Sequence, residues 1–415
     1  MYDKTVLPNG LRVISATLPH TEVVTVLVLV GTGSRFETID INGISHFLEH
    51  LFFKGAKRYP DTKAVSEAVD SVGGEFNAFT GKDYTGYYVR VAKEHASVAC
   101  DVISDMLLHA TFKPEEIERE RGVILEEINM YEDNPQSKIA EDFERQVFGD
   151  QPLGWSIAGP KDVIRQVSRD IIIDYRARTY VPQNIVVTIT GPLSHQESLK
   201  LATEYFQFTN DGEIPQSAKF VPQEFSRKHI VERKTEQAHF WLGTRAYDRN
   251  HPDRHALKVL GTILGGGMSS RLFLSVRERQ GLCYYIAANY DRYADTGSFA
   301  AYAGVDLTRV NQALRAIEQE FTHICEETIP ETELNKAKSY IKGKLVMSME
   351  DSESVANMIA HQQLFHDRFY TLDEQKEHVD SVSVQDIQRV ARDILKPENM
   401  ALSIIGPFKD EQIQF

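Results

Sequence analysis

The sequence predicts a mixed α/β protein of the α+β type, with two similar domains that each pack helices on a mainly antiparallel sheet. Its 415 residues exceed what one ordinary hydrophobic core organises. The order of expected strands and helices in the first half recurs in the second half. A polar segment with two prolines and little periodicity separates the halves. We therefore expect a first domain at 1–210, a linker at 211–227 and a second domain at 228–415.

The expected elements of the first domain can be read in chain order from hydrophobic periodicity and turn residues. They are a hairpin at Val6–Ile14 turning at Asn9-Gly10, a strand at Val23–Val30, a helix around residues 44–52, a second helix broken by Gly73-Gly74, strands at Glu75–Thr80 and Asp83–Val91, helices at Glu94–Thr111 and Pro114–Tyr131, further helix up to Phe148, a strand at Ile185–Thr190 and a helix to Phe206.

The second domain repeats this order. Its expected elements are a strand at Ala238–Thr244, helices at Asp253–Leu264 and Ser270–Arg279, strands at Leu282–Tyr290 and Gly297–Val305, and helices at Arg309–Glu326 and Glu331–Met349. Pro114-Glu115 opens a long helix in the first half and Pro330-Glu331 opens the matching helix in the second. We interpret the halves as diverged copies of one unit.

Composition excludes several classes of function. The formal net charge of −14 makes nucleic acid and anionic membrane poor partners, whereas basic peptides are better ones. The longest apolar stretch, Val23–Val30, is too short to cross a membrane, and no signal peptide is visible. Cys100, Cys283 and Cys325 form no CxxC pair and read as reduced thiols. We expect a cytoplasmic protein.

One pentapeptide, His46 to His50, contains candidate metal-ligating and catalytic side chains. At about 100° per residue, the apolar residues of its helix form one stripe: Ile44, Phe47, Leu48, Leu51 and Phe52. His46, Glu49 and His50 fall on the opposite side. Histidines four residues apart can reach one zinc ion, and Glu49 can take a proton from a water that the zinc activates. The alternative is a solvated helix with an accidental match, but a core histidine would lie within the stripe.

A third zinc ligand is expected on the helix that follows Pro114. Its glutamates include Glu116, Glu118, Glu120, Glu126 and Glu127, and its apolar stripe is Ile117, Ile124, Leu125 and Ile128. Glu120 and Glu127 lie together at the edge of that stripe, while Glu126 points to solvent. Glu127 is therefore the expected ligand and Glu120 a group that supports the site. Glu115, Glu116 and Glu118 are read as solvated helix charges.

These residues resemble a known pattern. His46-x-x-Glu49-His50, followed by Glu127, is similar to the inverted zinc motif of the pitrilysin family, the inverzincins. Glu120 also matches a family position. The surroundings Gly43-Ile44-Ser45 and Phe52-Phe53-Lys54-Gly55 are most similar to the mitochondrial-processing-peptidase branch and its short bacterial relatives. The resemblance covers essentially the whole chain, and it implies one Zn²⁺ per chain and a fold shaped as a bowl, half of a peptidase chamber.

The strand Glu75–Thr80 is a candidate for substrate binding. An exposed edge strand pairs with an extended peptide through main-chain hydrogen bonds, whatever the peptide sequence. The alternative is an ordinary hairpin strand. The resemblance implies that Asn77 and Ala78 contact the substrate backbone.

The second domain lacks the zinc motif, because its segment around Leu257–Gly267 contains no histidine. It carries Arg277 and Tyr284, which by themselves could be a solvated arginine and a core tyrosine. The resemblance implies that such a pair meets the zinc site from the opposite half of the molecule, where it holds the substrate carbonyl and stabilises the oxyanion. One chain holds both sets, so we expect a homodimer whose sites are completed in trans and whose chamber favours unfolded peptides.

The sequence thus predicts a zinc endopeptidase. The main rival is a noncatalytic structural, assembly or partner subunit of a processing-peptidase-like complex; such relatives typically lose zinc ligands, and this chain keeps them. A peptide-binding or metal-storage protein is a third reading, against which Glu49 argues because a structural site needs no base. Precursor processing and general peptide degradation are equally compatible with these residues.

Overall fold

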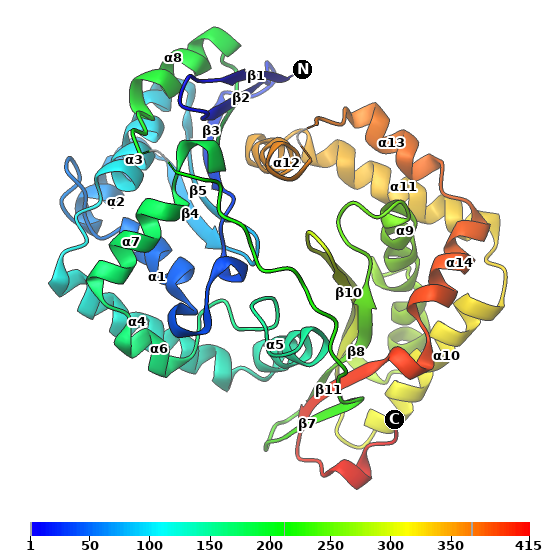
Figure 1. The fold of residues 1–415 in the computed structure, drawn as a ribbon. Coiled ribbons are helices and arrows are strands. Elements are labelled where there is room, and N and C mark those ends of the chain that lie inside the picture. Colours follow the sequence, from blue (N-terminus) through cyan, green and yellow to red (C-terminus); the bar gives the residue numbers. More distant parts are fainter. Residues whose placement is uncertain (1, 211, 367) are drawn as a thin grey trace. The chain divides into compact units, whose positions relative to one another are not determined.

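The computed structural model describes residues 2–210, 212–366 and 368–415, so residue 211, where the predicted linker begins, lies outside the described residues. The chain forms two compact units that are each assembled from three segments. The first unit comprises Met1–Ile128, Trp155–Ala218 and Val346–Tyr370, and the second comprises Asn129–Gly154, Lys219–Leu345 and Thr371–Phe415. Figure 1 draws the elements of both units in sequence colours.

The first unit is built on a six-stranded mixed sheet with the strand order β1-β2-β6-β3-β5-β4. Its strands are β1 (Tyr2–Val6), β2 (Arg12–Thr17), β3 (Val23–Val30), β4 (Glu75–Thr80), β5 (Thr85–Ala92) and β6 (Ile185–Gly191). Only β2 and β6 run parallel; the other neighbours are antiparallel. The strand β4 lies at one edge of this sheet and has β5 as its sole partner among the described strands.

Both faces of this sheet are covered by helices. In β3, Val26 and Val28 pack with α1, α2 and α3, while the alternate residues Leu27 and Leu29 pack with α12. The helices of this unit are α1 (Ile44–Phe52), α2 (Thr62–Asp70), α3 (Ala96–His109), most of α4 (Pro114–Asp133), α6 (Lys161–Gln166), α7 (Arg169–Thr179), α8 (His195–Tyr205) and α12 (Ser352–Phe365). A near-continuous apolar strand such as β3 is the expected consequence of burial on both faces.

The second unit repeats the plan on five strands in the order β7-β11-β8-β10-β9. The strands are β7 (Lys228–Glu232), β8 (Ala238–Ala246), β9 (Cys283–Arg292), β10 (Gly297–Val305) and β11 (Ala401–Gly406). The helices are α5 (Pro135–Phe148), α9 (Arg254–Gly265), the π-helix η5 (Phe273–Arg279), α10 (Val310–Glu326), most of α11 (Glu331–Ser348), α13 (Leu372–Asp380) and α14 (Val384–Ile394). Phe240 and Leu242 of β8 face α9, α10 and α14, whereas Trp241 between them packs against α5.

The two units interleave along the chain through two helices. The helix α5 follows α4 of the first repeat but belongs to the second unit, and α12 follows α11 of the second repeat but belongs to the first. The helix α12, orange in Figure 1, packs on β3 and β6, with Ser352 hydrogen-bonded to Thr25 and Thr190 of those strands. The predicted division at 1–210 and 228–415 differs here, because it follows the order of the chain and so assigns α5 to the first domain and α12 to the second.

The fold class is as predicted, with two homologous domains that each pack a mixed sheet with helices. The predicted strands Val23–Val30, Glu75–Thr80 and Gly297–Val305 have the observed bounds. The expected helix at Ser270–Arg279 is shorter and of π type, and β7, β11 and the elements after α11 were not predicted. Among the described residues, no helix is long and apolar enough to cross a membrane.

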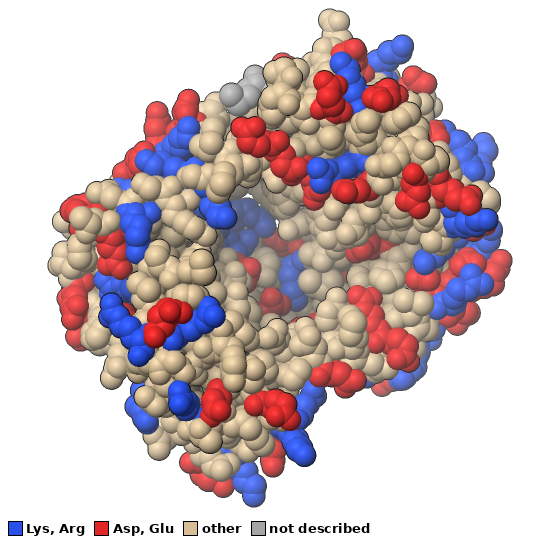
Figure 2. Space-filling model, turned by 180° about the vertical axis from the view of Figure 1, so that it is seen from behind, with Lys and Arg blue, Asp and Glu red and all other residues tan. Residues whose placement is uncertain are grey.

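The surface charge is mixed. On the face drawn in Figure 2, acidic and basic side chains lie side by side instead of forming a field of one sign. This face therefore shows no extended acidic surface, although the chain as a whole carries a formal net charge of −14.

Candidate metal centre

The apolar residues of α1 and its motif residues lie on the two opposite sides of the helix that its sequence predicts. Ile44, Phe47, Leu48, Leu51 and Phe52 are buried, and His46, Glu49 and His50 are partly exposed on the other side. The helix begins after Gly43, which has a φ of 98° and therefore a conformation that a glycine adopts without strain.

A buried carboxylate caps this helix from outside it. Glu37 accepts hydrogen bonds from the N–H groups of Gly43 (2.7 Å) and Ser45 (2.8 Å), and from the Nδ2 of Asn42 (2.8 Å). These N–H groups have no partner within the helix, and a negative charge is favourable there. Burial is the largest influence on Glu37 and raises the pKa of its carboxyl to about 7. Glu37 thus holds the start of the helix that carries the histidines.

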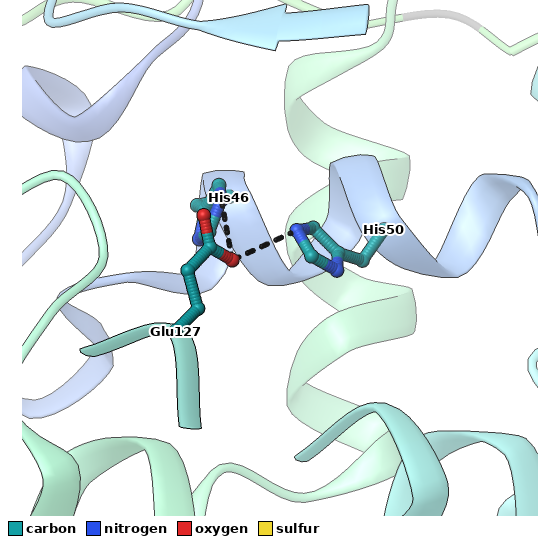
Figure 3. A group of neighbouring side chains, drawn as sticks. All are labelled: His46, His50 and Glu127. Carbon is teal, nitrogen blue, oxygen red and sulfur yellow. Dashed lines mark ion pairs between the residues drawn. The ribbon is translucent and has the colours of Figure 1, made fainter. Parts of the chain in front are cut away.

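Three side chains converge as expected for a zinc site (Figure 3). The ligand atoms of His46, His50 and Glu127 all lie within 4.8 Å of one another. The Oε2 of Glu127 is 3.7 Å from the Nε2 of His46 and 3.4 Å from the Nε2 of His50. Ligands placed tetrahedrally at about 2.1 Å from one ion are separated by about 3.4 Å. The donor set and its spacing therefore fit a zinc ion.

Glu120 supports this set from behind His50. Its Oε2 lies 3.2 Å from the Nδ1 of His50, and its Oε1 lies 2.9 Å from the Nζ of Lys54. The Glu120 side chain is only 3% exposed. A carboxylate on Nδ1 leaves Nε2 as the nitrogen that faces the metal. The Nδ1 of His46 is buried without a hydrogen-bond partner, so its ring is positioned by packing, including an edge-on contact with the His50 ring at 4.6 Å.

The electrostatics of the two histidines differ. Burial and the neighbouring His50 lower the pKa of His46 to about 4, which keeps its ring neutral at pH 7. Burial also acts to lower the pKa of His50, but hydrogen bonds to Glu120 and Glu127 outweigh it and raise that pKa to about 9. In the metal-free protein His50 is therefore protonated, and a metal has to displace that proton.

Glu49 lies on the same face as the histidines without being one of the three converging ligands. Burial raises the pKa of its carboxyl above the ordinary value. Its Oε2 accepts a hydrogen bond from the hydroxyl of Thr80, the last residue of β4. A carboxylate with a raised pKa, held next to a metal site, is suited to take up a proton.

The predicted substrate strand has an open edge beside this helix. Asn77 of β4 is exposed and Ala78 is partly exposed. The Ala78 N–H donates to the Oδ1 of Asn77, 2.9 Å away, which indicates that it faces the open edge and is not used in pairing with β5. The strand ends at Thr80, so its edge leads directly to Glu49.

Arg277 and Tyr284 lie in the second unit, on η5 and β9. Tyr284 is 64% exposed, so it is not a core tyrosine. The guanidinium of Arg277 lies 4.6 Å from the Phe273 ring centre and close to Cys283. His46, Glu49, His50, Glu120 and Glu127 are assembled within the first unit.

Comparison with known proteins identifies a family for both halves of the chain. Residues 12–161 match the model of the Insulinase (Peptidase family M16) domain, and residues 166–341 match that of the Peptidase M16 inactive domain. An uncharacterized zinc protease from Streptomyces coelicolor is 36% identical, over 99% of this chain and 90% of that protein. Another from Bacillus subtilis is 34% identical, over 96% and 97%.

The chain belongs to peptidase family M16. This is the pitrilysin family, and the resemblance drawn from the motif is confirmed. The fold agrees as well, since a protease from Helicobacter pylori superposes with a TM-score of 0.91 at 24% identity, covering 98% of this chain and all of that one. An M16-like peptidase from Alicyclobacillus acidocaldarius superposes with a TM-score of 0.86 at 20% identity, covering 98% of each chain.

Sequence reasoning missed Glu37 and Thr80. Glu37 sits seven positions before Ile44 in an irregular segment, where no periodicity signals a cap. Thr80 ends an edge strand, and its link to Glu49 depends on how β4 lies against α1. The sequence signal for Thr80 was its position as a polar residue at the end of the proposed substrate strand.

Proposed function

We propose that this M16 protein is a zinc-dependent endopeptidase that hydrolyses unfolded peptides, with one zinc ion held by His46, His50 and Glu127. The observation that carries the proposal is the convergence of three ligand atoms beside a fourth group, Glu49, that the metal does not need as a ligand. A storage or structural site would have no use for a base in that position.

Zinc, when bound, would polarise a water molecule and the peptide carbonyl. Glu49 takes the proton from the attacking water and delivers it to the leaving amine. The hydroxyl of Thr80 orients the carboxylate of Glu49. Glu120 holds the ring of His50 so that its Nε2 faces the metal.

A peptide would be aligned by the open edge of β4. Main-chain pairing at this edge ignores the peptide's side chains and requires an extended chain, which suits unfolded substrates. Asn77 now bonds the Ala78 N–H, and an incoming peptide carbonyl would replace it there. Asn77 and Ala78 are thus the proposed contacts to the substrate backbone.

The site would be completed by a second copy of the chain. Arg277 and Tyr284 are proposed to hold the substrate carbonyl and stabilise the oxyanion of the partner subunit's site. The resemblance to the family supports these roles, and the exposure of Tyr284 leaves its hydroxyl accessible. The three free cysteines favour a reducing, cytoplasmic environment.

The test is cleavage of a quenched basic peptide of roughly 20 residues, a length that spans an extended binding strand. Wild type, wild type with a chelator, Glu49→Gln and the matched control Glu126→Gln on the exposed side of α4 would be compared. We expect Glu49→Gln to bind zinc normally and to lose activity by about 10²–10⁴-fold. Full activity of Glu49→Gln would refute the mechanism, and an inactive zinc-loaded wild type would favour the noncatalytic subunit.

The trans arrangement has its own test. Glu49→Gln and Arg277→Ala subunits would be mixed and allowed to exchange. Partial recovery of activity is expected, because one of the two sites in a mixed dimer combines an intact Glu49 with an intact Arg277. Mixed dimers as inactive as both parents would show that Arg277 acts within its own chain.

A further inference from the structure

In the second unit, α9 and the edge strand β9 occupy the place that α1 and β4 occupy in the first. Both helices follow a central strand of the sheet, and both edge strands precede a hairpin partner, β10 or β5. The helix α9 lies directly on β9, because a Cβ at Gly265 would be 2.1 Å from the Ala288 nitrogen. The helix α9 has no second histidine four residues from its single one, unlike α1, and the junction carries several basic residues.

Four basic side chains meet at this junction. Arg254 and Lys258 lie one turn apart on α9 and therefore on one face of the helix. Arg292 is the last residue of β9, on the same face of the sheet as Tyr290, whose ring touches α9 at Gly261. His255 stacks on His378 of α13 with ring centres 4.7 Å apart. Arg254, His255, Lys258 and Arg292 are all half-buried.

None of these four groups has a carboxylate partner among the residues that the structure describes. Arg254 donates only to the carbonyl of His251, 3.3 Å away. The guanidinium of Arg292 lies 5.4 Å from the ring centre of Tyr290. The Nε2 of His255 is buried without a hydrogen-bond partner.

The nearby acids are engaged elsewhere. Asp253, which precedes α9, binds Arg389 through both of its oxygens and so is neutralised. Asp291, which precedes Arg292, points to the other face of the sheet and accepts from Asn289 and Ser298. In a chain with a net charge of −14, a half-buried group of cations without acids is unusual.

The cations act on one another unfavourably. Burial lowers the pKa of His255 to about 3, and every further influence on it comes from a basic group: Arg254, His378, Arg292 and Lys258. Burial and Arg292 also lower the pKa of Lys258. Unpaired charges held together away from water destabilise a fold unless an opposite charge joins them.

We propose that Arg254, Lys258 and Arg292 form a binding site for a small oxyanion with two negative charges, of the phosphate class. Two guanidinium groups offer paired N–H donors that match oxyanion geometry, and the Lys258 ammonium adds a point charge. The neutral His255 ring beside them has one nitrogen free for a further hydrogen bond. The two repeats would then use equivalent helix–edge junctions for opposite ligands, a metal cation in the first unit and an anion in the second.

The test uses the full chain with zinc bound and inorganic phosphate as the probe. Thermal unfolding and phosphorus NMR line widths would be followed as phosphate is added, against sodium chloride of equal ionic strength. Lys258→Met and Arg292→Gln remove one charge each, and Lys234→Met removes one from an exposed lysine of the same unit. All variants would first be checked for native circular dichroism.

We expect phosphate to raise the Tm of the wild type saturably and to broaden its resonance, with no such effect of chloride. Affinity should fall by about ten-fold or more in Lys258→Met and Arg292→Gln, and remain unchanged in Lys234→Met. Without phosphate, the two site variants should melt at or above the wild-type temperature, because repulsion is relieved. A wild type that shows no saturable phosphate effect, or equal phosphate affinity in all variants, would overturn the proposal.

Discussion

Replacing Glu120 by Gln tests whether a group outside the ligand set controls the zinc site. The side chain is almost fully buried and bonds His50 at 3.2 Å and Lys54 at 2.9 Å. Glutamine keeps the shape but removes the negative charge. His50 then loses the partner that fixes its ring, and the Lys54 ammonium is left unpaired close to a divalent cation.

The magnitude follows from these two effects. Loss of a carboxylate that orients a metal-bound histidine typically costs 10–100-fold in affinity, about 1.4–2.7 kcal/mol. The unpaired Lys54 acts in the same direction, since like charges repel. We therefore expect the larger loss in this range, with a zinc affinity about 100-fold below that of wild type.

The assay is competition with a chelator of known zinc affinity, at pH 7.5 and fixed ionic strength. Glu126→Gln is the matched control, because it makes the same change on the exposed side of α4. Heats of zinc binding in two buffers of different ionisation enthalpy would count released protons. Glu120→Gln should release fewer protons than wild type, because the pKa of His50 falls when the carboxylate is gone. Equal affinity and equal proton release in Glu120→Gln and Glu126→Gln would refute the reasoning.

Three further results are expected. Zinc affinity should rise about ten-fold per pH unit from pH 7 towards 9 and then level off, because His50, with its pKa raised to about 9, must lose a proton first; a flat profile in a chelator titration would contradict this. Since burial raises the pKa of Glu37 to about 7, the folded state holds that proton more tightly than the unfolded state, and stability should fall by up to about 3 kcal/mol as pH rises from 4.5 to 7. The free energy of unfolding of the metal-free protein, measured with urea, should depend less on pH in Glu37→Gln than in wild type. An unchanged pH dependence would contradict this role of Glu37. Ile359→Ala in α12 should cost about 2–5 kcal/mol and speed amide exchange in β3, while Met347→Ala, at an exposed position, should change little; equal effects would disprove the packing of α12 on the first sheet.

Much of the fold was accessible from local pattern. The helix α1 has the period that its sequence predicts, because burial of one face selects apolar residues at regular intervals, and β3 is the continuous apolar run expected of a strand buried on both faces. The strand Glu75–Thr80, considered as an exposed edge strand or an ordinary hairpin strand, lies at the edge of its sheet as β4. Two of the strands that were not predicted, β7 and β11, are short and pair with strands distant in sequence.

The candidate site likewise has residues that the sequence predicts and residues that only the tertiary structure shows. His46, Glu49 and His50 share one helix face, so their common direction follows from spacing alone. The choice of Glu127 over Glu126 also follows from helix geometry, since the apolar stripe of α4 decides which side faces inward. Glu37 and Thr80 reach α1 only through irregular backbone and strand packing, for which the sequence has no period.

The sequence by itself therefore determined the candidate zinc ligands, the candidate base and the repeat of one α/β unit, because each follows from the periodicity of single helices or from a recurring pattern. The tertiary structure alone decided that α5 and α12 belong to the units of opposite repeats, that Glu37 caps the metal-bearing helix and that unpaired cations gather at α9 and β9. The physical reason is that periodicity states which face of an element is buried. It does not state which distant surface covers that face, and this is settled only when the apolar faces of the whole chain find their best mutual fit.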